Sequence, residues 1–518
     1  MRQKSHFLMI IVVVTLLFTS DTAFVNYPAK LLHSQTASDW TTLKKTISVP
    51  PPPAYGPPFL PPVYGGWTGQ SEWSSYLFST EGNGFSKAET TLNPTTISKL
   101  TRYWSYHAKG AISSQPVVAN GMIYWGSWDG LEHATDLSGH QVWATKVGQT
   151  TDDSCNPPSA GTADTATVAT VLVNGIATSA VFVGGGDAAI YALDAGDGSV
   201  IWRTQLGSSP ADFLWSSPTV YNGSVYIGMA SFGDCPTVQG QVIQLKAATG
   251  NIQHVFSTVP DGCTGGGVWS SPVVDTHTGM LYISIGNADT CPLSAGYPSS
   301  LVELRASDLS FVDYWKIPQS ECVIDCDFGA TPTLFTATID GAKRSMIGLA
   351  HKNGTYYAFI RDAISDGPVW AANIAGGGSD PEDGDGSISP SAWDGNRLYV
   401  AGGGTSINGN YCRGSVRALD PATGNFLWEH CLANGPVLAP VTVIPDIVVV
   451  EEGPTMDIIS AASGKTLFTY TDSNNGSVFG GAASIANGVL YVGNFDGNLY
   501  AFGLPEGKQQ AQKNMVVQ

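Results

Sequence analysis

The feature that most constrains this chain is a short unit that recurs along it. In its clearest copy, Ser391–Trp428, a strand pattern over Leu398–Val400 is followed by an insert, a second strand over Ser415–Leu419, the turn DPATG and a strand that ends on Trp428. Proline and glycine suit the backbone of such a turn. The unit predicts a small antiparallel sheet that cannot bury its apolar faces alone, so similar neighbours must stack on it.

The unit repeats along most of the chain. Further copies lie at Val117–Trp143, Ala180–Trp202, Trp215–His254, Trp269–Trp315, Thr331–Trp370 and Ala439–Phe468, with a half copy at Ala482–Phe502. Their spacing of roughly 40–60 residues is the period of propeller blades. In most copies the residue four after the turn glycine is aromatic, which suits packing between adjacent blades. The repeats therefore predict seven full blades and one incomplete blade.

The two ends of the repeat array complement each other. Trp67–Trp104 has the terminal tryptophan of a unit without its earlier strands, whereas Ala482–Phe502 has the earlier strands without the last one. An N-terminal segment that supplies the outer strand of the last blade would close the ring and remove exposed edges. We therefore predict an all-β, eight-bladed β-propeller over residues 67–504, closed by an N-terminal segment and followed by a polar tail at 505–518.

The N-terminus reads as a targeting segment. Arg2 and Lys4 precede the apolar run Phe7–Phe18, and Ser20–Ala23 offers a cleavage site, so residues 1–23 are predicted to be a signal peptide of an exported protein. A retained membrane anchor is the alternative. Residues 24–66, with the proline-rich stretch Pro50–Pro62, are predicted to be a stiff linker.

The cysteines and the net charge of the chain indicate which covalent links and which partners to expect. Eight cysteines in an exported chain predict disulfides; Cys412 and Cys431 flank one strand–turn–strand unit and form the best candidate pair, and the other connectivities stay open. The Cys-x-x-Cys-His motif is absent from the sequence, so we expect no covalent haem. A net charge of −18 argues against nucleic acid as a partner, because phosphate binding needs clustered lysine and arginine.

Two inserts carry a specific resemblance to a known family. They are Gly262–Asn287, which contains GGGVW and IGN, and Glu321–Asp362, which contains DCDFG and HKNG. With the LYxG…ALDxxTGxxxW repeats, these segments resemble the quinoprotein alcohol dehydrogenases, whose eight-bladed propeller holds pyrroloquinoline quinone (PQQ) and calcium at its axis. The resemblance covers roughly Trp67 to Phe502, and DFGATP and GDCP are most similar to the polyvinyl-alcohol-dehydrogenase-like branch.

The resemblance implies a role for individual residues. It implies that Trp269 forms the floor under the quinone, that Asn287 ligates calcium and that Asp325 is the catalytic base beside the metal. It also implies that Lys352 binds the quinone carbonyls. The family's third ligand, a glutamate, is missing from the third-blade insert, where Asp234 is the only carboxylate and takes its place as a metal-ligand candidate.

Each of these residues also has a structural interpretation. Trp269 can be a packing tryptophan, Asn287 a turn asparagine, Asp325 a surface residue in a Cys322–Cys326 loop, and Lys352 a solvated lysine before a hairpin turn. The adjacent Cys-Cys pair that caps the quinone in many relatives is absent, and Cys155 lies alone in the corresponding connection. We interpret His351 and His254 as packing or surface residues, and Glu451–Glu452 as a solvated turn.

Two functions remain open at this point. The first is an exported PQQ- and calcium-dependent oxidoreductase that oxidises a small-molecule or polymeric alcohol and passes electrons to a separate acceptor. The second is a non-catalytic propeller of the same ancestry that acts as a binding or assembly scaffold. Convergence of Trp269, Asn287, Asp325 and Lys352 would favour the enzyme.

Overall fold

Strands and tight turns make up nearly all of the part of the chain that the structure describes. The computed structural model describes residues 71–322, 325–474 and 477–505, so the predicted signal peptide, linker and nearly all of the polar tail lie outside it. In these ranges, helix is confined to three single 3-10 turns, η1 (Ile97–Lys99), η2 (Ile364–Asp366) and η3 (Pro381–Asp383). No helix in the described ranges is long and apolar enough to cross a membrane.

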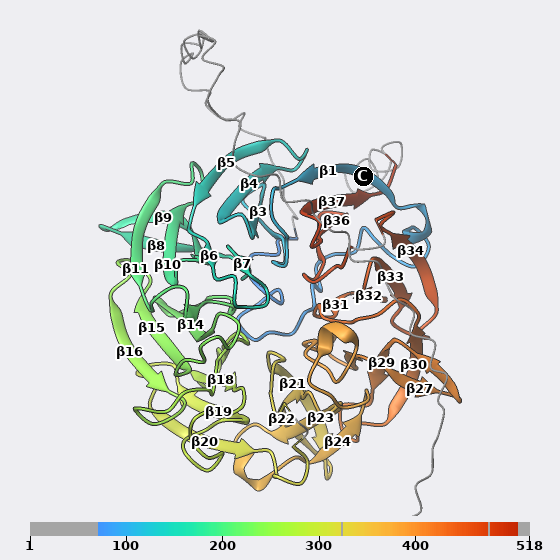
Figure 1. The fold of residues 1–518 in the computed structure, drawn as a ribbon. Helices are drawn as coiled ribbons and strands as arrows, with labels where there is room; N and C mark the ends of the chain where they lie inside the picture. The colour runs from blue at the N-terminus through green and yellow to red at the C-terminus, as the bar shows by residue number, and fades with distance from the viewer. Residues whose placement is uncertain (1–70, 323–324, 475–476, 506–518) are drawn as a thin grey trace, which may run out of the picture. The chain divides into compact units, whose positions relative to one another are not determined.

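The strands form eight antiparallel sheets arranged as blades around a ring (Figure 1). In blades 1 to 7 the strands follow chain order, and the last strand of each blade lies on the outer rim. Blade 1 consists of β2 (Val117–Ala119), β3 (Met122–Ser127), β4 (Leu131–Asp136) and β5 (Gln141–Lys146), and blade 2 of β8 (Thr167–Val173), β9 (Ile176–Gly184), β10 (Ala189–Asp194) and β11 (Val200–Gln205). Blade 3 consists of β13 (Thr219–Tyr221), β14 (Ser224–Ser231), β15 (Gln241–Lys246) and β16 (Ile252–Ser257), with β12 (Asp212–Phe213) also paired with β14. Blade 4 consists of β17 (Val273–Asp275), β18 (Met280–Ser284), β19 (Ser300–Arg305) and β20 (Phe311–Lys316).

The other half of the ring has the same plan, with one extra hairpin in each half. Blade 5 consists of β21 (Thr333–Ile339), β22 (Ala342–Ala350), β23 (Thr355–Ile360) and β24 (Trp370–Asn373), and blade 6 of β25 (Ala392–Trp393), β26 (Leu398–Gly402), β29 (Gly414–Leu419) and β30 (Phe426–Leu432). Blade 7 consists of β31 (Thr442–Ile444), β32 (Ile447–Glu452), β33 (Thr455–Ser460) and β34 (Thr466–Thr471). Blade 8 consists of β35 (Ser484–Ala486), β36 (Val489–Gly493), β37 (Asn498–Gly503) and β1 (Thr101–His107). The extra hairpins are β6 (Thr150–Thr151) with β7 (Ser159–Ala160), and β27 (Thr405–Ile407) with β28 (Asn410–Cys412). The predicted all-β, eight-bladed fold is confirmed.

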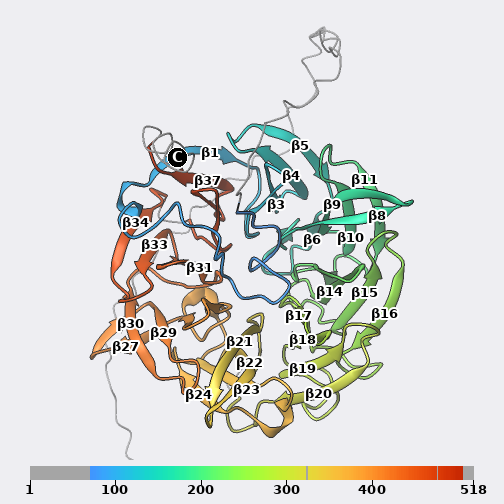
Figure 2. The same cartoon turned by 180° about the vertical axis from the view of Figure 1, so that it is seen from behind.

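The outer strand of blade 8 comes from the N-terminal side of the chain. β1 pairs antiparallel with β37, with Trp104 opposite Ala501 and Tyr106 opposite Leu499. The residues before β1 run across the inner ends of several blades, where Trp73 bridges Val118 and Phe85 bridges Val443. This segment, coloured blue, lies across the middle of the ring in both views (Figures 1 and 2).

The recurrent tryptophans join neighbouring blades. Trp428 at the end of blade 6 donates its indole N–H to the carbonyl of Ala461 in blade 7, at 2.9 Å, and its ring covers the turn glycine Gly464. Trp104, Trp143, Trp202 and Trp370 make the corresponding hydrogen bond to the next blade, at 2.8–3.1 Å. The packing role predicted for the aromatic residue four after the turn glycine is confirmed.

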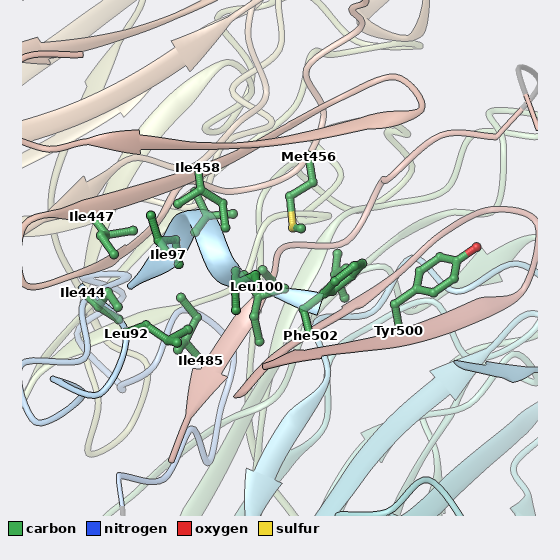
Figure 3. Packing of buried hydrophobic residues seen from close by; sticks show 14 of the residues in the cluster. Leu92, Ile97, Leu100, Ile444, Ile447, Met456, Ile458, Ile485, Tyr500 and Phe502 are labelled. Carbon is green, nitrogen blue, oxygen red and sulfur yellow. The ribbon is translucent and has the colours of Figure 1, made fainter. Parts of the chain in front are cut away.

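Apolar clusters between blades form the core. In the cluster between blades 7 and 8, Ile447 and Ile458 of blade 7 meet Ile485 and Phe502 of blade 8 (Figure 3). Leu92, Ile97 and Leu100, which lie on or beside η1, belong to the same cluster (Figure 3). The segment that leads into β1 is thereby held by apolar packing as well as by strand pairing.

All eight cysteines form disulfides. Cys412 pairs with Cys431, as predicted. The pairings that the sequence left open are Cys155–Cys235, Cys263–Cys291 and Cys322–Cys326. The last two enclose segments of the inserts that carry the candidate site residues.

One sequence interpretation is wrong. Glu451 and Glu452 do not form a solvated turn; they are the last residues of β32 and are both buried. The turn comes one residue later, because Glu452 pairs with Thr455 across Gly453 and Pro454. Glu451 accepts the backbone N–H of Ala483 in blade 8 at 2.9 Å.

Candidate functional site

The candidate residues meet where blades 4 and 5 approach the axis. Trp269 precedes β17, Asn287 follows β18, Asp325 precedes β21, and Lys352 follows β22. Propeller blades of this topology bring the starts of inner strands and the ends of second strands to one end of the ring. Four residues from two separate inserts are therefore placed together by the blade architecture.

Direct polar contacts join these residues. Lys352 Nζ lies 2.6 Å from Asp325 Oδ2 and 3.2 Å from Asp327 Oδ2. The side-chain amide of Asn287 donates to Asp325 Oδ1 at 3.1 Å, and the backbone N–H of Asn287 donates to Asp327 Oδ1. Two carboxylates, one ammonium and one amide thus form one connected cluster, in which Asp327 bridges the asparagine and the lysine.

Trp269 lies against this polar cluster. The ammonium of Lys352 is 5.5 Å from the centre of its ring, within cation–π range. Gly329 packs directly on the indole edge, and a Cβ there would overlap the ring. Glycine is therefore required at position 329 if the tryptophan is to keep its place.

The backbone around the cluster is tied down on both sides. Gly286 donates to the carbonyl of Gly267 at 2.9 Å, which fixes the residue before Asn287 to the GGGVW segment. The Cys263–Cys291 disulfide closes the same segment, with Cα atoms 5.5 Å apart. On the other side, Cys326 separates Asp325 from Asp327 and is bonded to Cys322.

Burial and neighbouring charges shift the pKa values of Asp325 and Lys352. Burial, followed by the charge of Asp327, raises the pKa of Asp325 above its ordinary value, although Lys352 opposes this. Burial alone would lower the pKa of Lys352, but the carboxylates of Asp327 and Asp325 outweigh it and raise that pKa. Lys352 is therefore held as a cation between the two aspartates.

An axial cavity adjoins one side of Trp269. It has a volume of about 130 Å³ and is lined by Trp269, Trp215, Asp164 and Tyr76, among residues from several blades. Tyr76 belongs to the segment that crosses the ring, so that segment forms part of the cavity wall.

The structure brings Trp269, Asn287, Asp325 and Lys352 together through direct contacts. Asp234 is exposed, and no hydrogen bond or ion pair between described residues joins it to the cluster. Asp234 therefore stays a predicted metal ligand. The second carboxylate in contact with the cluster is Asp327, which the sequence interpretation passed over. The signal for it was present in the motif DCDFG, whose second aspartate lies two residues after the first.

The donor set suits a hard cation. Asp325 offers carboxylate oxygens, and the side-chain oxygen of Asn287 accepts no hydrogen bond from any described residue. Amide and carboxylate oxygens are the ligands that calcium prefers. Within the described ranges, no group of three or more histidine, cysteine or acidic side chains forms a fuller metal site. Asp325 and Asn287 are therefore the oxygen donors that this cluster could offer to a metal ion.

The fold and the site define a propeller of the quinoprotein type. Residues 73–371 match the family described as glucose/ethanol/alcohol dehydrogenase, β-propeller domain, and the chain belongs to this family. Residues 358–516 also match the family described as outer membrane protein assembly factor BamB.

Individual relatives are distant. A polyvinylalcohol dehydrogenase from Sphingopyxis sp. (strain 113P3) is 23% identical over 85% of this chain, which spans 66% of that relative's length. Among solved structures, a quinohemoprotein alcohol dehydrogenase from Comamonas testosteroni superposes with a TM-score of 0.65 at 18% identity, covering 84% of this chain and 80% of that one. A europium-containing methanol dehydrogenase gives a TM-score of 0.64 at 16% identity, covering 84% of this chain and 98% of that one. At these identities the structural likeness concerns the fold.

Proposed function

We propose that this chain is an exported PQQ- and calcium-dependent oxidoreductase that oxidises an alcohol and passes the electrons to a separate acceptor. The observation that carries the proposal is the convergence of Trp269, Asn287, Asp325 and Lys352 on one cluster beside the axis. Family membership supports the cofactor, and the names of the relatives support an alcohol as substrate. The disulfides support export, because such bonds persist in oxidising compartments.

Each residue has a chemical task in this proposal. Asn287 and Asp325 would hold the metal through oxygen atoms, and the indole of Trp269 would pack against the flat cofactor. Lys352 places a fixed positive charge beside the site, where it stabilises negative charge that develops during oxidation. Asp327 orients both Asn287 and Lys352.

Asp325 is the proposed general base. Its carboxylate accepts the hydroxyl proton of the alcohol, and its raised pKa makes it a better proton acceptor than an ordinary aspartate. Lys352 Nζ, 2.6 Å from Oδ2, keeps that oxygen in place. When bound, PQQ with its metal would supply the oxidation itself, which no side chain can perform.

A binding titration tests the proposal. Purified protein is titrated with PQQ in calcium or in EDTA, and tryptophan fluorescence is followed. We expect saturable, calcium-dependent quenching that weakens in Trp269→Ala and Asn287→Ala. Asp325→Asn should retain the fold but lose dye-linked alcohol oxidation. Absence of cofactor binding, or unchanged turnover in Asp325→Asn, would overturn the assignment.

The second candidate is a cofactor-free scaffold. It is favoured by one observation, the match of residues 358–516 to the assembly factor family. A BamB structure from Moraxella catarrhalis also superposes, with a TM-score of 0.51 at 15% identity, covering 79% of this chain and 98% of that one. The same titration separates the two functions, because a scaffold would show no saturable quenching.

A further inference from the structure

Asp164 occupies a position that neighbouring blades give to serine. In blades 1, 2 and 3, one residue at the entrance to the inner strand accepts the N–H of a glycine in the second strand of its own blade. The pairs are Gly126 with Ser114 at 3.1 Å, Gly184 with Asp164 at 2.8 Å and Gly228 with Ser216 at 3.0 Å. Asp164 accepts the N–H of Gly184 with Oδ2, and its Oδ1 accepts no hydrogen bond from any described residue.

Glu132 is a second charged exception at a repeated position. It lies in β4 directly opposite Gly126. In each of the other blades, a residue of the third strand pairs with the second-strand residue that corresponds to Gly126. These third-strand residues are Ile190, Val242, Leu301, Tyr356, Ser415, Met456 and Leu499. Glu132 is therefore the one acidic residue at this place in the eight blades, and the fold alone does not require it.

Glu132 and Asp164 both lie next to residues of one cluster between blades 1 and 2. Glu132 lies two residues before Ala134 on β4 and so shares its face, which packs against blade 2. Asp164 lies two residues before Ala166, which packs against blade 1 in the same cluster. Both acids therefore continue the apolar contact between blades 1 and 2 toward the axis, where Asp164 lines the cavity.

A hydroxyl completes this group. Thr162 lies over Gly126, where its methyl group fills the space that a Cβ would need, on the face that Glu132 also uses. Its backbone N–H donates to Ser127 at 3.1 Å, which fixes the segment to blade 1. Three oxygen-bearing side chains from β4 and the 162–164 segment thus border one space.

These side chains are buried without partners. Glu132 and Thr162 are 0% exposed and Asp164 is 2% exposed. Both carboxylate oxygens of Glu132, Oδ1 of Asp164 and Oγ1 of Thr162 make no hydrogen bond to any described residue. A buried carboxylate must be neutralised by a proton, a counter-charge or a metal.

We propose that Glu132, Asp164 and Thr162 bind a calcium ion between blades 1 and 2. Two carboxylates balance a divalent charge, and all the available donors are the oxygens that a hard cation prefers. Asp164 also lines the axial cavity, so the proposed site lies beside that cavity. This site uses none of the residues assigned to the cofactor, so it does not depend on the proposed oxidoreductase function.

Calcium binding to the full chain without PQQ tests the proposal. The informative variant is Glu132→Ile with Asp164→Ser, which restores the residues of blades 2 and 3 at these positions. Glu132→Gln is a second, nearly isosteric variant, and Asp325→Asn removes a ligand of the other candidate metal site. Bound calcium is counted by equilibrium dialysis, and the Tm is measured in calcium and in EDTA.

We expect calcium to raise the Tm of wild type and of Asp325→Asn by a few degrees. The double variant and Glu132→Gln should lose this rise together with one bound calcium, and the double variant should remain folded in EDTA. An unchanged calcium count in both variants would overturn the proposal. So would the absence of bound calcium from Asp325→Asn, because the pair would then hold protons instead.

Discussion

At the scale of single residues, the candidate site depends on a shared charge. Two carboxylates lie within 3.2 Å of one ammonium, and their charges raise the pKa of Lys352, while burial and the charge of Asp327 raise the pKa of Asp325. Asp327 has an additional task, because it accepts the backbone N–H of Asn287. Removing the Asp327 carboxylate therefore releases the backbone of Asn287, a proposed metal ligand, and also removes one of the two negative charges beside Lys352.

Asp327→Asn should weaken calcium-dependent PQQ binding by about 10- to 100-fold, the usual effect of losing a residue that orients a metal ligand. Affinity is measured by the fluorescence titration at fixed calcium. Asp340→Asn is the matched control, because Asp340 is an exposed aspartate in the turn between β21 and β22. Equal affinities for the two variants would show that Asp327 does not position the site.

Glu451 predicts a pH dependence of stability. Burial raises its pKa from 4.5 to about 8, and the backbone N–H of Ala483 only partly opposes this. The folded state binds the proton of Glu451 more tightly than the unfolded state does. The contribution of Glu451 to the free energy of unfolding is therefore most favourable below pH 4.5. It is lost as the pH rises through 8.

Glu451→Gln should therefore gain stability relative to wild type as the pH rises from 4.5 to 8, by a total on the order of a few kcal/mol. The difference in the free energy of unfolding is measured by urea titration at several pH values. Glu382→Gln, at an exposed glutamate, serves as the control and should give a difference that does not vary with pH. A flat difference for Glu451→Gln as well would contradict the assignment.

The sequence indicated which residues lie together where a motif named them, and it misplaced a residue where burial depended on register. Trp269, Asn287, Asp325 and Lys352 lie in short motifs and do meet in space. Glu451 sits next to a second glutamate and before Gly-Pro, so its surroundings in the sequence indicate a solvated turn. Only the pairing of β32 with β33 places it against the next blade.

At the scale of elements, the contact between a tryptophan and the next turn glycine is the repeated joint of the ring. Gly464 has φ +67°, and a Cβ there would lie 2.6 Å from the ring of Trp428. Gly409, in the β27–β28 hairpin, has φ +79°, but a Cβ there would meet no atom within 4 Å. The two glycines share a backbone conformation and differ in packing.

Gly409→Ala should destabilise the protein by about 1 kcal/mol, because alanine resists a positive φ. Gly464→Ala should cost roughly 2–4 kcal/mol, since it adds the displacement of Trp428 to the same backbone strain. Thermal unfolding of both variants gives the difference. If the two alanines were equally tolerated, the tryptophan–glycine contact would not be what joins the blades.

The elements were predictable because turn glycines and terminal tryptophans recur at fixed spacing. That spacing gave the number of blades, and the half copy at the C-terminal end implied a strand from elsewhere. The path of residues 71–100 was not predictable, because they lack the strand pattern and hydrogen-bond to several blades in turn. Long-range contacts of this kind leave no local signal.

At the scale of the whole molecule, blade 8 is assembled from both ends of the described chain. Glu89, which is 1% exposed, accepts hydrogen bonds from Ser71 at 2.9 Å, from the backbone of Thr91 at 2.7 Å and from the backbone of Gly488 at 2.9 Å. One carboxylate thus joins the N-terminal segment to the turn between β35 and β36.

Glu89→Ala should lower stability by roughly 3 kcal/mol, because it leaves buried backbone donors without an acceptor. The ring should loosen where its two ends meet, so amides of β1 and β37 should exchange with solvent faster, while those of β17–β20 on the opposite side should keep their protection. Glu81→Ala removes a carboxylate of the same segment that accepts one exposed hydrogen bond, from Thr276, and should leave both regions unchanged. Hydrogen exchange that rose equally in blade 4 and blade 8 would mean that the ring opens as a single unit, and Glu89 would then stabilise the fold without acting as its closure.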